Sequence, residues 1–447
     1  MSDRRRAAAA VSVSHPGHSL HRLGGGLRVI VAPMEARASV SVGFMFGVGS
    51  RHEDDSEAGL AHFIEHMVFK GGARFPTARA ISEQIERVGG SLDAATDREA
   101  TVFSARVPAQ SLALAVDVLA DMLFAPAVDP GELSKERLVV IEELRSYVDT
   151  PQEHVNVLFD EVMWPGHPLG RDVAGREETV RSFERDDCLR HLRAHYRLDN
   201  LVVAVAGAVE TEEALKLVSE ALARARGGKA GGNGHLVRRA VEPAASVPSR
   251  GRGQVRLLRR RLEQANIVVG GPSCSYRAEE RFASDIMSSL LGEGMSSRLF
   301  LELREERALA YDVCSSIGRL SDSGALSIYL GCDPKRAVEA LRAAVGELRR
   351  LAEEGITSDE LSKGREYVKG RLLLGLEGTG SRASFLGQQE LLLGEILTAA
   401  EVVERLDAVD EQAVQEAAGA VLEGGLRAAV IGPFQSEERF RAALDAA

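Results

Sequence analysis

The sequence predicts an α+β protein of two homologous domains, each a mostly antiparallel sheet with helices packed on one face. Three observations support this class. Strand-like segments follow one another without a helix between them, which favours antiparallel pairing. Segments with apolar residues at helical spacing occur beside them. Similar strand and helix units recur in the two halves of the chain, which indicates a duplication.

The expected elements of the first half justify the mixed class. Three segments are alternating or continuously apolar over strand length, and they are expected to be strands: 27–32, 39–46 and 101–107. Four segments repeat apolar residues at helical spacing, and they are expected to be helices: 60–69, 78–88, 112–123 and 130–147.

Two short apolar segments that end in glycine carry the evidence for a repeat. RLDNLVVAVAG ends at Gly207 and LEGGLRAAVIG ends at Gly432, 225 residues later (432 − 207). Acidic residues that can start a helix follow each segment at the same offset. Chance reuse of a common α/β unit is the alternative, but the repeated offset favours duplication.

A stretch rich in Gly, Pro, Ser and Arg divides the chain into parts of similar size. The expected organisation is a flexible N-terminal tail at 1–22, a first domain at 23–225, a linker at 226–253 and a second homologous domain at 254–447. The tail has a basic start, but its apolar stretch is shorter and weaker than that of a secretory signal.

The composition excludes several classes of protein. The 447 residues include 55 Lys and Arg against 66 Asp and Glu, which gives a formal charge of −11. Such an acidic chain is not expected to bind nucleic acid. No apolar run approaches the ~18 residues of a membrane-spanning helix. The four cysteines form no CxxC pair, so a reducing compartment is favoured and the cytoplasm is the expected location.

The pattern H-x-x-E-H at residues 62–66 is the strongest sign of chemistry. His62 and His66 are four residues apart, so on a helix they share a face and can bind one ion. Glu65 lies beside them and can accept a proton from bound water. Zinc accepts imidazole and carboxylate donors and keeps a position for water in catalytic sites. A surface helix with two solvated histidines is the alternative, but the apolar residues around the pattern favour a half-buried site.

A third ligand is expected from the helix at 130–147. Glu136 and Glu143 are seven residues apart on one face, whereas Glu142 points about 100° away from Glu143. Spacing alone does not choose among the three carboxylates. A solvated helix carboxylate is the alternative interpretation of each.

These residues resemble those of the pitrilysin-type inverzincin metallopeptidases, and within them the processing-peptidase-like subfamily of half-size chains. The likeness covers roughly residues 23–440. It implies that His62, His66 and Glu143 bind one zinc ion per chain. It also implies that Glu65 is the catalytic base and that Glu136 orients the site.

A second segment, GGSLDAATDREATVF at 89–103, is similar to the family's strand that lines the cleft and pairs with extended substrate. The resemblance implies that Asp93 and Ala94 contact substrate. Two departures occur, since Asp93 stands where the family usually has Asn and Phe103 where it often has Tyr. Asp cannot donate the hydrogen bonds of an amide, and it is expected to add a negative charge near the metal.

A third segment, LLGEGMSSRLFLELREERALAYDV at 290–313, resembles a signature of the family's second domain. It implies that Arg304 and Tyr311 reach the substrate near the zinc. Arg offers a planar fork of donors for peptide carbonyls, and Tyr offers a hydroxyl. A helix-surface arginine and a core tyrosine are the alternative.

The resemblance implies a zinc-dependent metalloendopeptidase. It would hydrolyse unfolded peptides or presequence-like segments in a closed chamber, with water activated by zinc. Because the zinc residues and the Arg/Tyr pair occur in one chain, the expected assembly is an active homodimer, with a heterodimer of two related chains as the alternative. A non-catalytic or partner-dependent subunit of a processing-peptidase-like complex is the alternative function.

Overall fold

The computed structural model describes residues 11–227 and 254–446, and these form two compact units. The first unit contains the described parts of Met1–Leu144, Asp172–Val241 and Leu374–Ile396. The second contains the described parts of Arg145–Arg171, Glu242–Leu373 and Leu397–Ala447. Each unit is built on one sheet, and each is described by itself.

The first sheet has the strand order β1-β2-β3-β7-β4-β6-β5. Neighbouring strands pair antiparallel, except that β3 and β7 are parallel. Strand β5 therefore forms one edge. The strands are β1 (Val11–His15), β2 (His18–Arg22), β3 (Arg28–Pro33), β4 (Ser39–Phe46), β5 (Ser91–Thr96), β6 (Thr101–Pro108) and β7 (Leu201–Gly207).

The second sheet has the order β10-β11-β9-β12-β8, and only β8 and β12 are parallel. This order repeats β5-β6-β4-β7-β3 of the first sheet strand for strand, including the parallel pair. The strands are β8 (Gln254–Arg259), β9 (Ala265–Pro272), β10 (Ala310–Arg319), β11 (Gly324–Cys332) and β12 (Arg427–Gly432). The predicted fold class and its duplication are confirmed.

Helices cover one face of each sheet and build its main core. In the first unit these are α1 (Leu60–Val68), α2 (Ala78–Glu86), α3 (Leu112–Phe124), α4 (Pro130–Asp149), α6 (Glu177–Ser182), α7 (Arg185–His195) and α8 (Thr211–Ala225). In the second unit these are α9 (Arg281–Gly292), α10 (Ala337–Glu354), α11 (Ser358–Gly375), α13 (Ala399–Asp407), α14 (Glu411–Glu423) and α15 (Glu438–Ala446). All seven helices and strands predicted for the first half are present, with ends shifted by no more than two residues.

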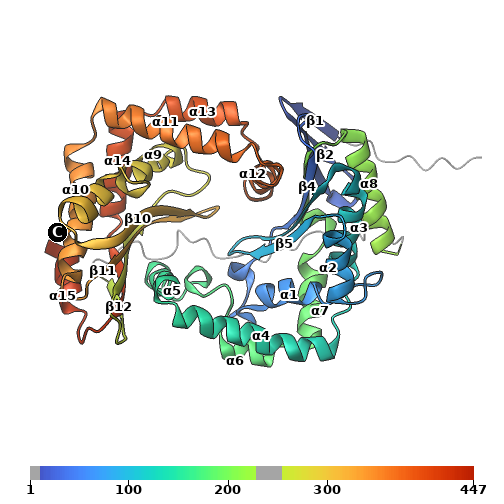
Figure 1. The fold of residues 1–447 in the computed structure, drawn as a ribbon, viewed down its shortest axis with the longest axis horizontal. Helices are drawn as coiled ribbons and strands as arrows, with labels where there is room; N and C mark the ends of the chain where they lie inside the picture. The colour runs from blue at the N-terminus through green and yellow to red at the C-terminus, as the bar shows by residue number, and fades with distance from the viewer. Residues whose placement is uncertain (1–10, 228–253, 447) are drawn as a thin grey trace, which may run out of the picture. The chain divides into compact units, whose positions relative to one another are not determined.

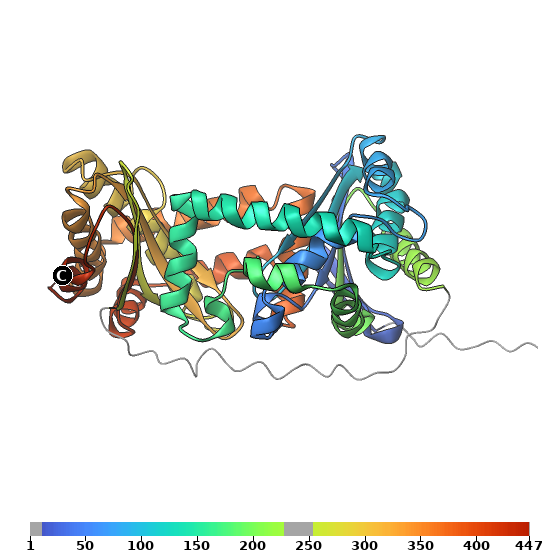
Figure 2. The same ribbon diagram turned by 90° about the horizontal axis from the view of Figure 1, so that it is seen from below.

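The opposite face of each sheet is covered by a helix from the other half of the chain. Helix α12 (Thr379–Leu392) packs on β4 and β7 of the first sheet, with Leu386 and Met45 in the shared core. Helix α5 (Pro151–Met163) packs on β12 and β9 of the second sheet through Phe159. Figure 1 shows α3 and α8 on one side of the first sheet and α12 on the other. In Figure 2, α5 is the green helix against the yellow and orange second sheet.

Because of these two helices, the observed units differ from the expected division of the chain at residues 226–253. Segment 145–171 belongs to the second unit and 374–396 to the first, because each helix buries its apolar side against the sheet of the other half. Helical periodicity shows that a helix has an apolar side, but it does not show which sheet that side meets. Of the expected linker, residues 228–253 lie outside the described residues.

Residues 11–22, expected to belong to a flexible tail, form a hairpin instead. Strand β1 pairs with β2 and β2 pairs with β3, so the hairpin extends the first sheet. Leu20 is buried, and Arg22 forms an ion pair with the buried Glu390 of α12. The contacts of Leu20 and Arg22 with α12 join residues distant in sequence, which a local pattern does not contain. Residues 1–10 lie outside the described residues.

No helix in the part of the chain that the structure describes is long and apolar enough to cross a membrane.

Candidate metal centre

Helix α1 carries the H-x-x-E-H pattern, and its start is fixed by a buried carboxylate. Glu53 is 4% exposed and accepts hydrogen bonds from the backbone N–H groups of Gly59 (2.8 Å) and Ala61 (2.6 Å). It therefore satisfies donors that a helix leaves unpaired at its N-terminus. Gly59 has φ 93°, and a Cβ there would collide with the backbone of Ala174. Only glycine fits this entry into the helix.

Helices α1 and α4 bring two histidines and one glutamate together. The Nε2 atom of His62 lies 3.8 Å from Oε1 of Glu143, and Nε2 of His66 lies 3.4 Å from Oε2 of the same carboxylate. One potential ligand atom from each residue lies within 4.8 Å of the others. Glu142, the third candidate on this part of α4, is exposed and is not in the cluster. The geometry thus selects Glu143, which spacing alone did not.

Glu136 lies two helical turns before Glu143 on α4 and contacts His66 on the side of the ring away from Glu143. It is 3% exposed and lies 2.8 Å from Nδ1 of His66 and 2.5 Å from Nζ of Lys70. Burial raises the pKa of Glu136, but its bonds to His66 and Lys70 outweigh burial and hold the pKa below its usual value. An ionised carboxylate only accepts hydrogen bonds, so His66 donates from Nδ1, and Nε2 is the nitrogen that faces Glu143.

This protonation pattern makes the cluster suited to a cation. Burial lowers the pKa of His66, but its bond to Glu136 and the charge of Glu143 outweigh burial and raise the pKa above its usual value, so this position favours a positive charge. A metal cation between Nε2 of His66 and Glu143 would supply that charge. Two imidazoles and one carboxylate are the donors that zinc takes in catalytic sites. Burial lowers the pKa of His62 to about 4, with His66 acting in the same direction, so this imidazole is neutral at pH 7. The residues therefore fit a zinc ion.

Glu65 lies next to the cluster and is held from strand β5. Its Oε2 accepts a hydrogen bond of 2.5 Å from the hydroxyl of Thr96, the last residue of β5. Burial raises the pKa of Glu65, and the bond from Thr96 opposes that shift. A carboxylate with a raised pKa is a stronger base than a solvated one, and it can accept and return a proton near neutral pH.

Strand β5 places Asp93 and Ala94 on opposite faces of the first sheet. Ala94 packs against the core that contains α1, whereas Asp93 lines a groove on the other face. Side chains alternate along a strand, so the carboxylate of Asp93 points away from the face on which Thr96 holds Glu65. The expectation that Asp93 places a negative charge beside the metal is therefore wrong.

Arg304 and Tyr311 lie together in the second unit. The guanidinium of Arg304 is 5.2 Å from the ring centre of Tyr311 and 4.9 Å from that of Phe300. Arg304 belongs to a π-helical turn, η8 (Phe300–Glu306), and Tyr311 lies at the start of the edge strand β10. Tyr311 is 76% exposed, so it is not the core tyrosine of the alternative interpretation.

Comparisons with known proteins agree with this geometry. The family model described as "Insulinase (Peptidase family M16)" matches residues 28–177, and "Peptidase M16 inactive domain" matches residues 182–368. An "uncharacterized zinc protease" of Streptomyces coelicolor is 35% identical over 425 residues, which are 94% of this chain and 90% of that protein. The chain belongs to peptidase family M16. The resemblance to half-size pitrilysin-type chains is confirmed.

Two further proteins match this chain over most of their length. YmxG of Bacillus subtilis, also named an uncharacterized zinc protease, is 34% identical over 409 residues, 91% of this chain and 96% of YmxG. A crystal structure of a protease from Helicobacter pylori has a TM-score of 0.84 at 21% identity and covers 96% of this chain and 100% of that one. At that identity it supports the fold alone. The names of the relatives point to a zinc metallopeptidase.

Two residues of this M16 chain were missed as parts of the site by sequence reasoning. Neither Lys70 nor Thr96 is assigned a role from the sequence. Lys70 follows His66 by four residues and lies just past the end of α1, so it was within reach of a carboxylate that orients His66. The contact between Thr96 and Glu65 joins a strand to a helix distant in sequence, and no spacing contains it.

Proposed function

We propose that this protein is a zinc-dependent endopeptidase that hydrolyses unfolded or presequence-like peptides. The observation that carries the proposal is the convergence of His62, His66 and Glu143, with Glu65 beside them and joined through Thr96 to an edge strand. A zinc ion held there would polarise a water molecule and a peptide carbonyl.

Each residue of the cluster then has a defined task. His62, His66 and Glu143 supply the metal donors, and Glu136 holds His66 in the tautomer that exposes Nε2. Glu65 accepts a proton from the attacking water and returns it to the amine that leaves.

The edge of strand β5 supports an extended binding mode for the peptide. Among the described strands, β5 pairs only with β6, so its other side can receive an added strand. An added strand needs a chain segment that is not already folded. This requirement favours unfolded peptides over folded proteins, in agreement with the proposed chamber.

Cleavage of a fluorogenic extended peptide tests the proposal. The zinc-loaded chain and its Glu65→Gln variant are assayed together, and zinc content is measured in both. We expect equal zinc content and a loss of cleavage of at least about 100-fold in the variant. Glu142→Gln, a change of an exposed neighbour on α4, is the matched control and retains cleavage.

The same experiment separates the alternative function. A protein that binds zinc but cleaves no peptide from a diverse library would be a partner-dependent or non-catalytic subunit. Equal cleavage by the parent and Glu65→Gln would disprove the role of Glu65.

We further propose that the active assembly is a homodimer in which Arg304 and Tyr311 bind substrate. Both sets of residues occur in one chain, and Tyr311 is exposed with Arg304 packed beside it. Light scattering of the active protein is expected to give twice the mass of 48.0 kDa. An active monomer at nanomolar concentration would contradict the assembly but not the chemistry.

A further inference from the structure

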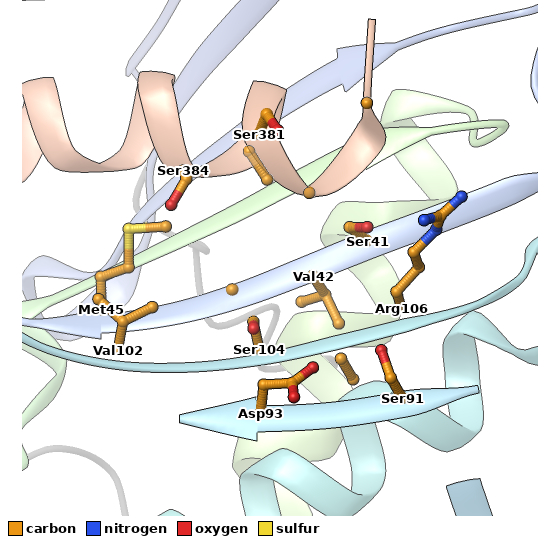
Figure 3. Close-up of a pocket in the computed structure, with 15 residues that line it drawn as sticks. Ser41, Val42, Met45, Ser91, Asp93, Val102, Ser104, Arg106, Ser381 and Ser384 are labelled. Carbon is orange, nitrogen blue, oxygen red and sulfur yellow. The ribbon is translucent and has the colours of Figure 1, made fainter. Parts of the chain in front are cut away.

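A groove of about 580 Å³ lies on the face of the first sheet that Thr96 and Glu65 do not use. Strands β4, β5 and β6 form its floor, and the first turn of α12 forms its wall. Figure 3 shows Ser381 and Ser384 of α12 above the strands, with Asp93 and Ser91 on β5 at the opposite side. The groove therefore reaches the edge strand at which we propose that a peptide binds.

Two charged side chains of the groove have no partner in the described structure. Asp93 and Arg106 form neither an ion pair nor a side-chain hydrogen bond with any residue at 11–227 or 254–446. Both are exposed on the groove face. Their charges are available to a molecule that enters the groove.

The strand register fixes the order of these charges along the edge. Asp93 pairs across the ladder with Ser104, and Ser91 pairs with Arg106. Serine side chains are short, so the longer Arg106 side chain dominates the groove at the level of Ser91, and the carboxylate dominates at Asp93. Asp93 on β5 and Arg106 on β6 thus place one negative and one positive charge two register positions apart.

A peptide that adds to β5 presents every second side chain to this groove. Directly opposite residues on paired strands have Cβ atoms about 4.5–5.5 Å apart, and unlike charges there attract. A Lys or Arg opposite Asp93 would meet the carboxylate. Two residues along the peptide, opposite Ser91, a second cation would lie across Ser91 from Arg106 of β6 and be repelled, whereas an acidic residue would be attracted.

We propose that this groove is a specificity subsite that selects peptides with a basic residue opposite Asp93 and an acidic or neutral residue two positions away, opposite Ser91. The proposal rests on the proposed peptide binding at β5. The ligand is an extended peptide in which a basic and an acidic residue are two positions apart. This specificity is narrower than a general preference for basic peptides.

Two peptides of identical composition test the subsite. Both are neutral extended hosts, and they differ only in the order of one pair, Lys-x-Glu or Glu-x-Lys. Because the two peptides have the same net charge, the acidic protein attracts both equally at long range. A difference in affinity therefore reports local contacts. Binding is measured by fluorescence anisotropy to the zinc-loaded Glu65→Gln variant, which avoids turnover.

We expect one order to bind about two- to fivefold more tightly than the other at low salt, and the difference to shrink as salt is added. Asp93→Lys combined with Arg106→Glu keeps the net charge and is expected to invert the preference. The control is Glu35→Gln combined with Lys216→Gln, which neutralises one exposed acid and one exposed base elsewhere in the same unit. It keeps the parent preference.

Equal affinities of the Glu65→Gln protein for the two orders, no binding of either peptide, or an unchanged preference after the charge swap in the same background would each overturn the subsite. Circular dichroism checks that the swapped variant is folded, and Asp93→Asn offers a milder change that should reduce the ratio. Cleavage by the parent with Glu65 intact is measured separately. If binding depends on the order of the charges but no peptide is cleaved, the subsite is supported and the peptidase function is rejected. If peptides are cleaved but binding does not depend on the order, the peptidase function is supported and the subsite is rejected.

Discussion

At Lys70, one ion pair sets the orientation of two further side chains. Its ammonium group lies 2.5 Å from Oε2 of Glu136, and Oε1 of that carboxylate contacts Nδ1 of His66. Because Glu136 is buried, it depends on this cation and this imidazole to remain ionised and in place.

Lys70→Met is expected to weaken zinc binding about tenfold, because Glu136 then holds His66 less firmly. Lys70→Arg is expected to restore most of the affinity, since it returns the charge. Affinity is measured by competition with a zinc chelator. Lys216→Met, at an exposed position of α8, serves as the control, and the same loss in that variant would contradict the role of Lys70.

His191, which is not part of the metal cluster, is expected to make the stability of the protein depend on pH. It is buried in α7, and burial, together with the charges of His195, His52 and Arg190, holds its pKa well below 6.5. The folded protein keeps this ring neutral, while the unfolded chain protonates it near pH 6.5. The unfolded state thus binds more protons below that pH, and stability present above pH 6.5 is lost on acidification.

His191 is expected to contribute unfolding free energy at pH 7 that is lost as the pH falls to 5. Urea unfolding of the parent and of His191→Met at both values measures it, and the variant should lose less stability on acidification. His15→Gln removes an exposed histidine and should behave like the parent. Parallel pH curves for the parent and His191→Met would refute the assignment.

Single residues also show how far the sequence predicts the site. His62, Glu65 and His66 follow from one pattern on one helix, so local spacing places them together. The choice of Glu143 over Glu142 needed either the family resemblance or the observed direction of each side chain. The expected negative charge of Asp93 near the metal was not found, because the resemblance identified its strand but not the face on which its side chain lies.

At the scale of elements, strands and helices of the first half were predictable because their patterns are local. The π-helical turn η8 before Tyr311 was not, and it leads into an unusual backbone conformation. Ala308 has φ 46°, which a residue with a Cβ adopts at a cost. Arg336 donates hydrogen bonds to the carbonyls of Ala308 and Arg307 and holds this turn in place.

Ala308→Gly is expected to stabilise the protein by about 0.5–1 kcal/mol, because glycine adopts this conformation without steric strain. Chemical denaturation measures the change. Ala420→Gly is an instructive control, since Ala420 is exposed within α14 and the same substitution there should destabilise by about 1 kcal/mol. Destabilisation at both positions would show that the turn does not require the conformation seen at Ala308.

At the scale of the whole molecule, the exchange of α5 and α12 makes each sheet depend on both halves of the sequence. The first sheet lacks a cover over Met45 and Ala204 unless α12 is present. At Gly387 of α12 a Cβ would collide with Met45, so the two surfaces approach closely.

A fragment ending at residue 227 is therefore expected to expose this apolar face, to bind a hydrophobic dye and to aggregate. Co-expression with a second fragment that begins at 254 should restore a soluble complex, because α12 is supplied again. Gel filtration and dye fluorescence of the single and paired fragments measure both effects. A soluble first fragment that unfolds as cooperatively as the full chain would contradict this dependence.

The bond between Thr96 and Glu65 also has a consequence for timing. Edge strands are the least restrained part of a sheet, and Thr96 is the last residue of one. A peptide that pairs along β5 would restrain this strand and, through it, Glu65, the proposed catalytic base. A short peptide that reaches the zinc without pairing would meet a loosely held carboxylate. The length of a substrate should then appear in kcat as well as in KM, so that the enzyme hydrolyses quickly only those chains that have already become part of its sheet.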